Sequence, residues 1–528
     1  MLSYLILLPL LIAIFLFLFY TASVGKPLAI LAQIAMVYLS VYFFLQARLS
    51  PVYEAIGDFS PVHLGINLIM DNVSGAFVVL TTFIFLALSV FSYHEKQSKL
   101  FWLLMYIWQS VVISLFLTRD FFNIFVLMEV STVVIVIMIM YNRHSRSMYD
   151  GIMYLMANII SVQFFLFGMA YMYMLTGTLD VDVMAQRAAY IDPDQLVLPF
   201  ALMIAGMGFK ATLVPFGSWL PKVRAIPRAP APVAALLSAM QAKGILFVIM
   251  HIHAVFPMLG LEPYFIAIGV ITALGGIAMA LGQKDIKLML AYSSIAQVGL
   301  IVVGLNLGGT YSFIGSLYHM INHVLFKVAL FLGASMVIEV YGTRDITKIS
   351  GLFKKNPLLA VLNIVPVVSI MGAPLFNGSM SKYFLMAHLG TGDPLFWVIS
   401  LINLGTILVF VRYSTMFFGA IPAGTFNVPM PFTKTSTLLA LGALCLGFGV
   451  FATDVIYLLF NEHVVLSAVG YTEKSIVFAI SLAIAIVAYK QVITRTSVFA
   501  NIGKIDFTLK NLALSIGIFF VIIVVIFA

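Results

Sequence analysis

Long apolar runs follow one another along the whole chain, separated by short polar stretches. A helix needs roughly 20 apolar residues to cross the hydrocarbon core of a membrane. Two of the runs, 312–340 and 357–390, exceed one straight crossing and imply tilt, a break or an interfacial piece. The pattern predicts an all-α integral membrane protein of 14–16 transmembrane helices. The 16 runs are 2–20, 27–46, 74–93, 100–118, 121–141, 151–176, 196–220, 231–256, 264–282, 288–307, 312–340, 357–390, 395–419, 436–460, 475–491 and 511–528.

Composition narrows the class of protein. Hydrophobic residues make up 62% of the chain and charged residues 9%, whereas soluble globular proteins carry about 25% charged residues. This excludes a soluble enzyme, a nucleic-acid-binding protein and a disordered scaffold. The single cysteine, Cys445, excludes a disulfide framework, and the sequence contains neither a nucleotide-binding loop nor a cysteine cluster. We expect no cofactor, so any redox chemistry belongs to other subunits, and whether the parent complex is an enzyme stays open.

The basic residues in the loops predict an orientation. If loops are numbered by the span that they follow, odd loops carry 19 of the 28 lysine and arginine residues, and even loops carry four. Cytoplasmic loops of membrane proteins are enriched in these residues. We therefore expect the odd loops on the cytoplasmic side and both termini on the outer side. The four in even loops are Arg48, Arg119, Arg187 and Lys474.

Five basic residues remain within the spans. They are Lys210, Lys243, Lys327, Lys382 and Arg412, and Glu129 lies near the middle of the fifth span. An ion at mid-membrane costs roughly 2.5–3.5 kcal/mol on insertion scales, so such residues are candidates for an ion pathway. Lysine suits a proton relay because its pKa moves readily, whereas arginine stays charged. The alternative is that some of these lysines extend to the membrane interface, and for Arg412 we favour that structural role.

Two histidines and a lysine share one helical face. His319, His323 and Lys327 follow one another at intervals of four residues in the eleventh span, a spacing that aligns side chains along a helix. A line of titratable groups through apolar sequence favours a proton relay over static polar packing. A metal site fits poorly because no Asp, Glu or Cys accompanies them.

Helix-breaking residues accompany two of the lysines. Pro215 and Gly217 follow Lys210, and Pro374 and Gly378 precede Lys382. Broken helices in corresponding halves of a transporter point to an ion site between structural repeats, although kinks are common in membrane helices. We expect three N-terminal helices in residues 1–98, five-helix repeats in 99–256 and 257–420, and C-terminal helices in 421–528.

Several motifs resemble one family. The chain is similar to the antiporter-like subunits of respiratory complex I, Mrp-type multisubunit sodium/proton antiporters and membrane-bound hydrogenases. The resemblance covers about residues 70–420. It rests on Phe125–Glu129, Gly208–Phe216, Trp219–Pro221, Ala229–Ser238 with Lys243, Asp285–Gln297, His319–Lys327, Gly342–Asp345 and Pro374–Lys382.

The resemblance implies a fold and residue roles. The family fold has 14 core helices with two inverted five-helix repeats. Glu129 resembles the glutamate that pairs with the lysine of the seventh span, here Lys210. Lys243 resembles the connecting residue of the eighth span, His319, His323 and Lys327 the central axis, and Lys382 the lysine of the twelfth span. Gly217, Lys222 and Arg224 depart from the family pattern, which places the cytoplasmic half-channel contacts in doubt.

The resemblance also implies a function. We expect a proton-translocating subunit of an Mrp-type antiporter or related hydrogenase in a prokaryotic plasma membrane, with sodium coupling open. Its partners would be other membrane subunits, including homologous antiporter-like subunits, together with protons, sodium ions and lipid, but no nucleic acid. The alternatives are the pump module of a redox enzyme, such as NADH:quinone oxidoreductase, and a non-transporting scaffold or bicarbonate-uptake partner.

Overall fold

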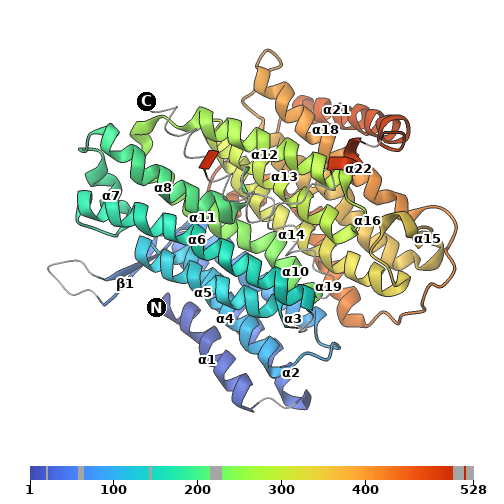
Figure 1. Ribbon diagram of the computed structural model, residues 1–528, viewed down its shortest axis with the longest axis horizontal. Helices are drawn as coiled ribbons and strands as arrows, with labels where there is room; N and C mark the ends of the chain where they lie inside the picture. The colour runs from blue at the N-terminus through green and yellow to red at the C-terminus, as the bar shows by residue number, and fades with distance from the viewer. Residues whose placement is uncertain are drawn as a thin grey trace. The chain divides into compact units, whose positions relative to one another are not determined.

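The computed structural model describes residues 1–19, 22–57, 65–141, 145–214, 229–496, 498–502 and 517–518. Within these ranges, 13 helices are long and apolar enough to cross a membrane, and shorter apolar helices cover Ser3–Phe19 and Pro357–Met371. The ribbon in Figure 1 is almost wholly helical. These helices agree with the predicted all-α membrane architecture. The chain divides into two compact units.

The first unit contains the described residues up to 214 together with Met240–Leu261 and positions 517–518. It includes an antiparallel hairpin, β1 (Val52–Ile56) and β2 (Ile66–Met70), which the hydropathy pattern does not predict. Its helices are α1 (Ser3–Phe19), α2 (Ala22–Ala47), α3 (Asn72–Phe91), α4 (Lys99–Leu117), α5 (Phe121–Ile139), α6 (Ser145–Thr176), α7 (Val181–Ala188), α8 (Pro193–Ala211), α11 (Ala242–Val255) and the short η2 (Pro257–Leu259).

The second unit contains residues 229–239 and the described residues from 262 to 506. Figure 1 shows α12 and α13 side by side, and they pack along their length. Its helices are α10 (Ala231–Leu236), α12 (Glu262–Gly282), α13 (Ile286–Asn306), α14 (Thr310–Tyr341), α15 (Leu352–Lys355), α16 (Pro357–Met371), α17 (Asn377–Leu385), α18 (Pro394–Ser414), α19 (Phe432–Val450), α20 (Ala452–Phe460), α21 (Ala468–Ala488) and α22 (Val498–Ile502), with short segments η3 (Ile346–Lys348), η4 (Thr415–Phe417) and η5 (Tyr489–Ile493).

Glycine allows α12 and α13 to approach closely. A Cβ atom on Gly276 would lie 2.6 Å from the backbone nitrogen of Ala296, and one on Gly299 would lie 2.5 Å from that of Ala273. Small residues at helix interfaces favour association in a membrane because they let two backbones gain close van der Waals packing. Close backbone contact therefore explains why the largely apolar helices α12 and α13 pack tightly.

The two overlong runs behave differently. The run 312–340 forms the unbroken α14, whose 32 residues extend about 48 Å at 1.5 Å per residue. The run 357–390 divides into α16 and α17, with Gly372 in the left-handed region at φ 88°. The run 436–460 also divides, into α19 and α20. The last run, 511–528, lies outside the described residues apart from positions 517 and 518.

A turn recurs in the two units at an interval of 165 residues. Asp120 caps α5 and forms an isolated bridge with Asp180, and Asp285 caps α13 and forms the same bridge with Asp345. The backbone bonds match: the nitrogen of Phe121 donates to Leu179 O, and that of Ile286 donates to Arg344 O. The turns share the sequence Gly-Thr-x-Asp, at 177–180 and 342–345, and both glycines have positive φ. The two segments therefore share one local design.

Candidate ion-translocation sites

The Lys210 ammonium group lies at the end of α8 and is held by neutral oxygen atoms. Its Nζ donates to Thr132 Oγ1 at 2.8 Å and to the Met128 carbonyl at 3.4 Å. The helix ends at Ala211, and Thr212 takes a left-handed conformation at φ 65°. The run therefore breaks before Pro215 and Gly217, which lie outside the described residues, as do Lys222 and Arg224.

Glu129 faces the same lysine without a direct ion pair. No ion pair within 4 Å links Glu129 to another described residue. Its carboxylate is close enough to Lys210 for the two charges to interact, and its Oε1 is buried with no hydrogen-bond partner among the described residues. Because the carboxylate of Glu129 and the amine of Lys210 are not in direct contact, the distance between them can change. Such a change would alter how strongly the carboxylate favours the protonated lysine.

Lys243 follows a π-helical segment. The segment η1 (Leu237–Gln241) interrupts the helical stretch Ala231–Val255, and such bulges occur frequently at functional sites. The Gln241 side chain accepts from Trp108 Nε1 at 3.3 Å and donates to Ser131 Oγ at 3.4 Å. Lys243 itself is completely buried. Within the first unit, the bulge thus ties the helix that carries Lys243 to α4 and α5.

His319 joins three helices of the second unit. Its Nε2 lies 3.0 Å from Gln297 Oε1 on α13, and its Nδ1 lies 2.8 Å from Ser381 Oγ on α17. Ser381 directly precedes Lys382 in the chain. Because the Gln297 amide oxygen only accepts hydrogen bonds, Nε2 carries a hydrogen in this contact, and in the neutral imidazole Nδ1 then accepts from the Ser381 hydroxyl. His323 lies one turn further along α14 and is equally buried, with its ring against Phe326 at 5.4 Å.

Lys327 is held in the same way as Lys210. Its Nζ donates to the Leu290 carbonyl at 2.9 Å and to Ser293 Oγ, both on α13. The ring of Phe410 lies 5.6 Å from the same nitrogen, within the range of a cation–π interaction. In each unit, therefore, a buried lysine donates to a hydroxyl and a carbonyl on the helix that follows the recurring aspartate.

Lys382 lies at the helix break. Its Nζ donates to the Ile370 carbonyl at 3.0 Å, one of the carbonyls left without a helical partner where α16 ends. Gly378, near the start of α17, permits the close approach, since a Cβ there would lie 1.9 Å from the Ser369 oxygen. Pro374 lies in the break itself. The break thus provides the hydrogen-bond acceptor for the lysine.

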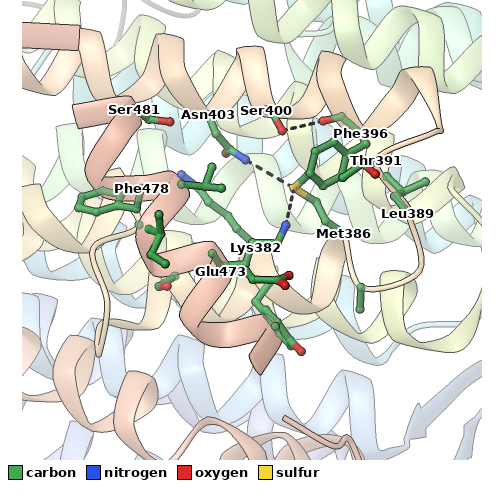
Figure 2. A pocket seen from close by; sticks show the side chains of 18 of the residues that line it. Lys382, Met386, Leu389, Thr391, Phe396, Ser400, Asn403, Glu473, Phe478 and Ser481 are labelled. Carbon is green, nitrogen blue, oxygen red and sulfur yellow. Dashed lines mark hydrogen bonds between the residues drawn. The ribbon is translucent and has the colours of Figure 1, made fainter. Parts of the chain in front are cut away.

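A pocket of about 670 Å³ opens beside Lys382. Figure 2 shows Lys382, Asn403 and Glu473 in its walls, which α17, α18 and α21 form together. Lys474 of α21, expected in a loop, also lines this pocket because α21 begins at Ala468 and not near 475. Two other expected loop lysines, Lys287 and Lys434, likewise lie in the first turn of a helix.

A second polar group lies at one end of the first unit. Arg119 forms an ion pair with Asp71 at 2.9 Å, and its Nη1 lies 3.2 Å from His251 Nδ1. Phe247 packs edge-on against His251 with ring centres 4.8 Å apart. Phe247 lies between Lys243 and His251 on α11. It also packs against Phe77 and Phe116. This aromatic cluster therefore separates Lys243 from the ion pair of Arg119 and Asp71.

The structure thus brings the predicted residues into two groups. Glu129 and Lys210 interact in the first unit, which also contains Lys243, and His319 approaches the residue next to Lys382 in the second. Sequence reasoning gave no role to the neutral partners Thr132, Ser293 and Gln297, although the last two lie within the motif Asp285–Gln297. The described residues contain no group of three or more metal-ligating side chains.

The comparisons with known proteins define the family. The model of the NADH:quinone oxidoreductase/Mrp antiporter transmembrane family matches residues 118–408, more than half of the chain. The chain belongs to this family. It is 29% identical over 439 residues to NADH-quinone oxidoreductase subunit N of Desulforudis audaxviator, covering 78% of this chain and 85% of that protein. It is also 29% identical to the putative antiporter subunit mnhA2 of Staphylococcus aureus, but spans only 50% of that protein and 70% of itself.

Solved structures show the same fold. A chain of the membrane-bound sulfane sulfur reductase, an archaeal respiratory membrane complex, has a TM-score of 0.79 at 26% identity, covering 91% of this chain and 99% of that one. The Mrp complex of a Dietzia species has a TM-score of 0.75 at 22% identity, over 92% and 98% of the two chains. Complex I of Thermus thermophilus gives 0.71 at 21% identity, over 86% and 98%.

Together these findings confirm the predicted resemblance and the integral membrane fold. The chain is an antiporter-like membrane subunit of the kind found in complex I and Mrp-type complexes. Its structural neighbours are subunits of multisubunit membrane complexes, which supports other membrane subunits as its partners.

Proposed function

We propose that the chain moves protons along a buried axis of Glu129, Lys210, Lys243, His319, His323, Lys327 and Lys382. The observation that carries this proposal is the shared setting of Lys210 and Lys327. Each buried amine donates to a hydroxyl and to a backbone carbonyl of a neighbouring helix. Such partners accept hydrogen bonds from the charged amine and from the neutral amine, so the lysine can load and release a proton.

The order of transfer follows from the chemistry of the groups. Uptake from one side loads Lys210 and Lys243 in the first unit, and a change in the separation of Glu129 and Lys210 controls that loading. The histidines of α14 then carry the proton towards Lys382, since His319 lies against the residue next to it. Lys382 releases the proton on the other side. Sodium coupling is a separate step, since a fixed ammonium group repels Na⁺ unless it is neutralised.

The kind of complex to which the chain belongs is a separate point. We propose a respiratory membrane complex as the stronger candidate over an Mrp-type antiporter. This chain covers 85% of the subunit N relative but only 50% of the mnhA2 relative. The chain of the archaeal respiratory membrane complex, at 26% identity and a TM-score of 0.79, supports this choice. The chain would then be the pump module of a redox enzyme whose redox centres lie on other subunits.

Orientation and internal repeats complete the proposal. We infer a prokaryotic plasma membrane with odd loops inside and both termini outside, from the distribution of basic residues. We also infer that 99–256 and 257–420 are repeats of one five-helix unit. The turn that recurs at Asp120 and Asp285 supports this inference.

The test is ion movement by the intact complex in sealed vesicles. We expect Lys210→Ala and Glu129→Gln to lower proton transport at least tenfold while assembly, followed by subunit composition, is unchanged. Lys348→Ala, which removes an exposed lysine, serves as the control and should transport normally. Normal transport by either buried-site variant would contradict the mechanism and favour the scaffold alternative.

A further inference from the structure

The pocket beside Lys382 has a wall that the family match does not include. The matched region ends at residue 408, whereas α21 covers Ala468–Ala488 and supplies Glu473, Lys474 and Ser481 to the pocket. The remaining walls come from α17, α18, the segment between them, and Met371 and Gly372 at the end of α16. This pocket therefore combines a core lysine with a helix outside the matched core.

The lining of the pocket can hold water. Its volume of about 670 Å³ is far larger than the roughly 10–15 Å³ that one water molecule needs. Hydroxyl groups of Ser379, Ser400 and Ser481 lie in the wall, and the Oδ1 atom of Asn403 is buried without a hydrogen-bond partner among the described residues. Water satisfies such a group, whereas a lipid chain leaves it unsatisfied.

The two charged residues of α21 are arranged differently. Lys474 Nζ lies 3.4 Å from the sulfur of Met386 and 5.4 Å from the ring centre of Phe396, so it is held against the wall. Glu473 is exposed. No described residue forms an ion pair with Glu473. Its carboxylate therefore stays available in a wall that it shares with Lys382, as Figure 2 shows.

We propose that this pocket is the outlet through which Lys382 exchanges its proton with the aqueous phase, and that Glu473 receives the proton on the way. This inference rests on the proposed proton translocation and adds a residue to it. The ammonium group of Lys382 loses one N–H proton and keeps the electron pair. The proton passes through pocket water to a carboxylate oxygen of Glu473, and the resulting carboxylic acid releases it to bulk water.

The first experiment compares carboxylate variants in the intact complex. We expect Glu473→Gln to lower proton transport at least fivefold and Glu473→Asp to restore most of the rate, because aspartate keeps the proton acceptor. Glu462→Gln makes the same change in charge at an exposed residue outside the pocket, and should transport normally. Full transport by Glu473→Gln while Lys382→Ala is inactive would overturn the outlet and leave the proposed function standing. Full transport by Lys382→Ala would contradict the proposed function itself.

The second experiment asks whether the pocket contains water. The only cysteine of the chain, Cys445, is completely buried, so introduced cysteines report with little background. We expect Ser400→Cys and Ser481→Cys to react with a charged, membrane-impermeant thiol reagent and to lose transport on reaction. Leu439→Cys, at an exposed apolar position on α19, should stay unmodified. Failure of both pocket cysteines to react would show a pocket closed to water or filled by lipid, and would overturn the proposal.

Discussion

At the scale of the residue, the choice of lysine partners decides what each site can do. A carboxylate at hydrogen-bond distance would favour the charged amine and oppose proton release. Thr132 and Ser293 instead offer hydroxyl groups, which accept a hydrogen bond from an ammonium group and can also donate one to a neutral amine. In the proposed mechanism, Glu129 acts on Lys210 through longer-range electrostatic attraction.

This arrangement predicts the effect of changing Thr132. Thr132→Val keeps the shape of the side chain and removes the acceptor for Lys210, and a hydrogen bond to a charged group contributes about 1.5–3 kcal/mol. We expect proton transport in vesicles to fall about tenfold or more. Thr132→Ser retains the hydroxyl and is the matched control. An equal loss in both variants would indicate that packing, and not the hydrogen bond, matters at this position.

At the scale of the element, aspartates at helix starts position α5 and α13. Asp120 accepts from the backbone nitrogen of Asn123 at 2.6 Å, and Asp285 accepts from those of Lys287 and Leu288. Each cap satisfies backbone donors that the first turn of a helix leaves unpaired. The equivalent turns thereby set where α5 and α13 begin, and hence the depth at which they present Thr132 and Ser293.

Two substitutions of Asp120 distinguish its role as a helix cap from the effect of its negative charge. Burial raises the pKa of the Asp120 carboxyl, and the nearby Asp180 carboxylate raises it further. Backbone hydrogen bonds lower it, but the net effect is a raised pKa. Asp120→Ala should lower stability by about 1 kcal/mol through loss of the cap, whereas Asp120→Asn should not. An aspartate pKa raised in the folded state makes ionisation a cost to folding. The wild type should therefore approach the Asn variant in stability as the pH falls through that raised pKa.

Thermal unfolding of the purified complex as a function of pH checks this prediction. A Tm of the Asn variant equal to or above that of the wild type at neutral pH is expected, with the difference shrinking in acid. Equal destabilisation by Ala and Asn would show that the carboxylate charge itself is needed at the turn.

At the scale of the whole molecule, the chain acts within a larger assembly. The segments with apolar side chains exposed to the surroundings, including Ile476, Ile480 and Ile484 on α21, are suited to lipid or to neighbouring membrane subunits.

Purification of the intact complex in mild detergent tests the parent assembly. If the chain is the pump module of a respiratory complex, mass spectrometry of the purified subunits should identify iron–sulfur subunits together with homologous antiporter-like subunits. Finding only small membrane subunits would contradict the respiratory assignment and support a secondary antiporter driven by an ion gradient.

Much of the fold is predictable from the sequence because a membrane imposes a local rule. Every backbone polar group in lipid must be bonded within its own segment, so long apolar runs become helices wherever they occur. The long helices follow from that rule, whereas the burial of Lys210, Lys243, His319, His323, Lys327 and Lys382 follows from the cost of exposing polar side chains to lipid. The recurrence of Gly-Thr-x-Asp at 177–180 and 342–345 was a further signal of internal repetition, although hydropathy alone does not register it.

Other features depend on which segments meet, and only the tertiary structure decided them. The β1–β2 hairpin pairs strands too short to stand out in hydropathy. The hydroxyl partners of Lys210 and Lys327 lie 78 and 34 residues away in the sequence, and residues of α21 join Lys382 only in the assembled pocket. The hydropathy of a segment and the cost of placing its charged residues in a membrane depend on that segment alone. Hydrogen-bond partners and pockets depend on how several segments pack together.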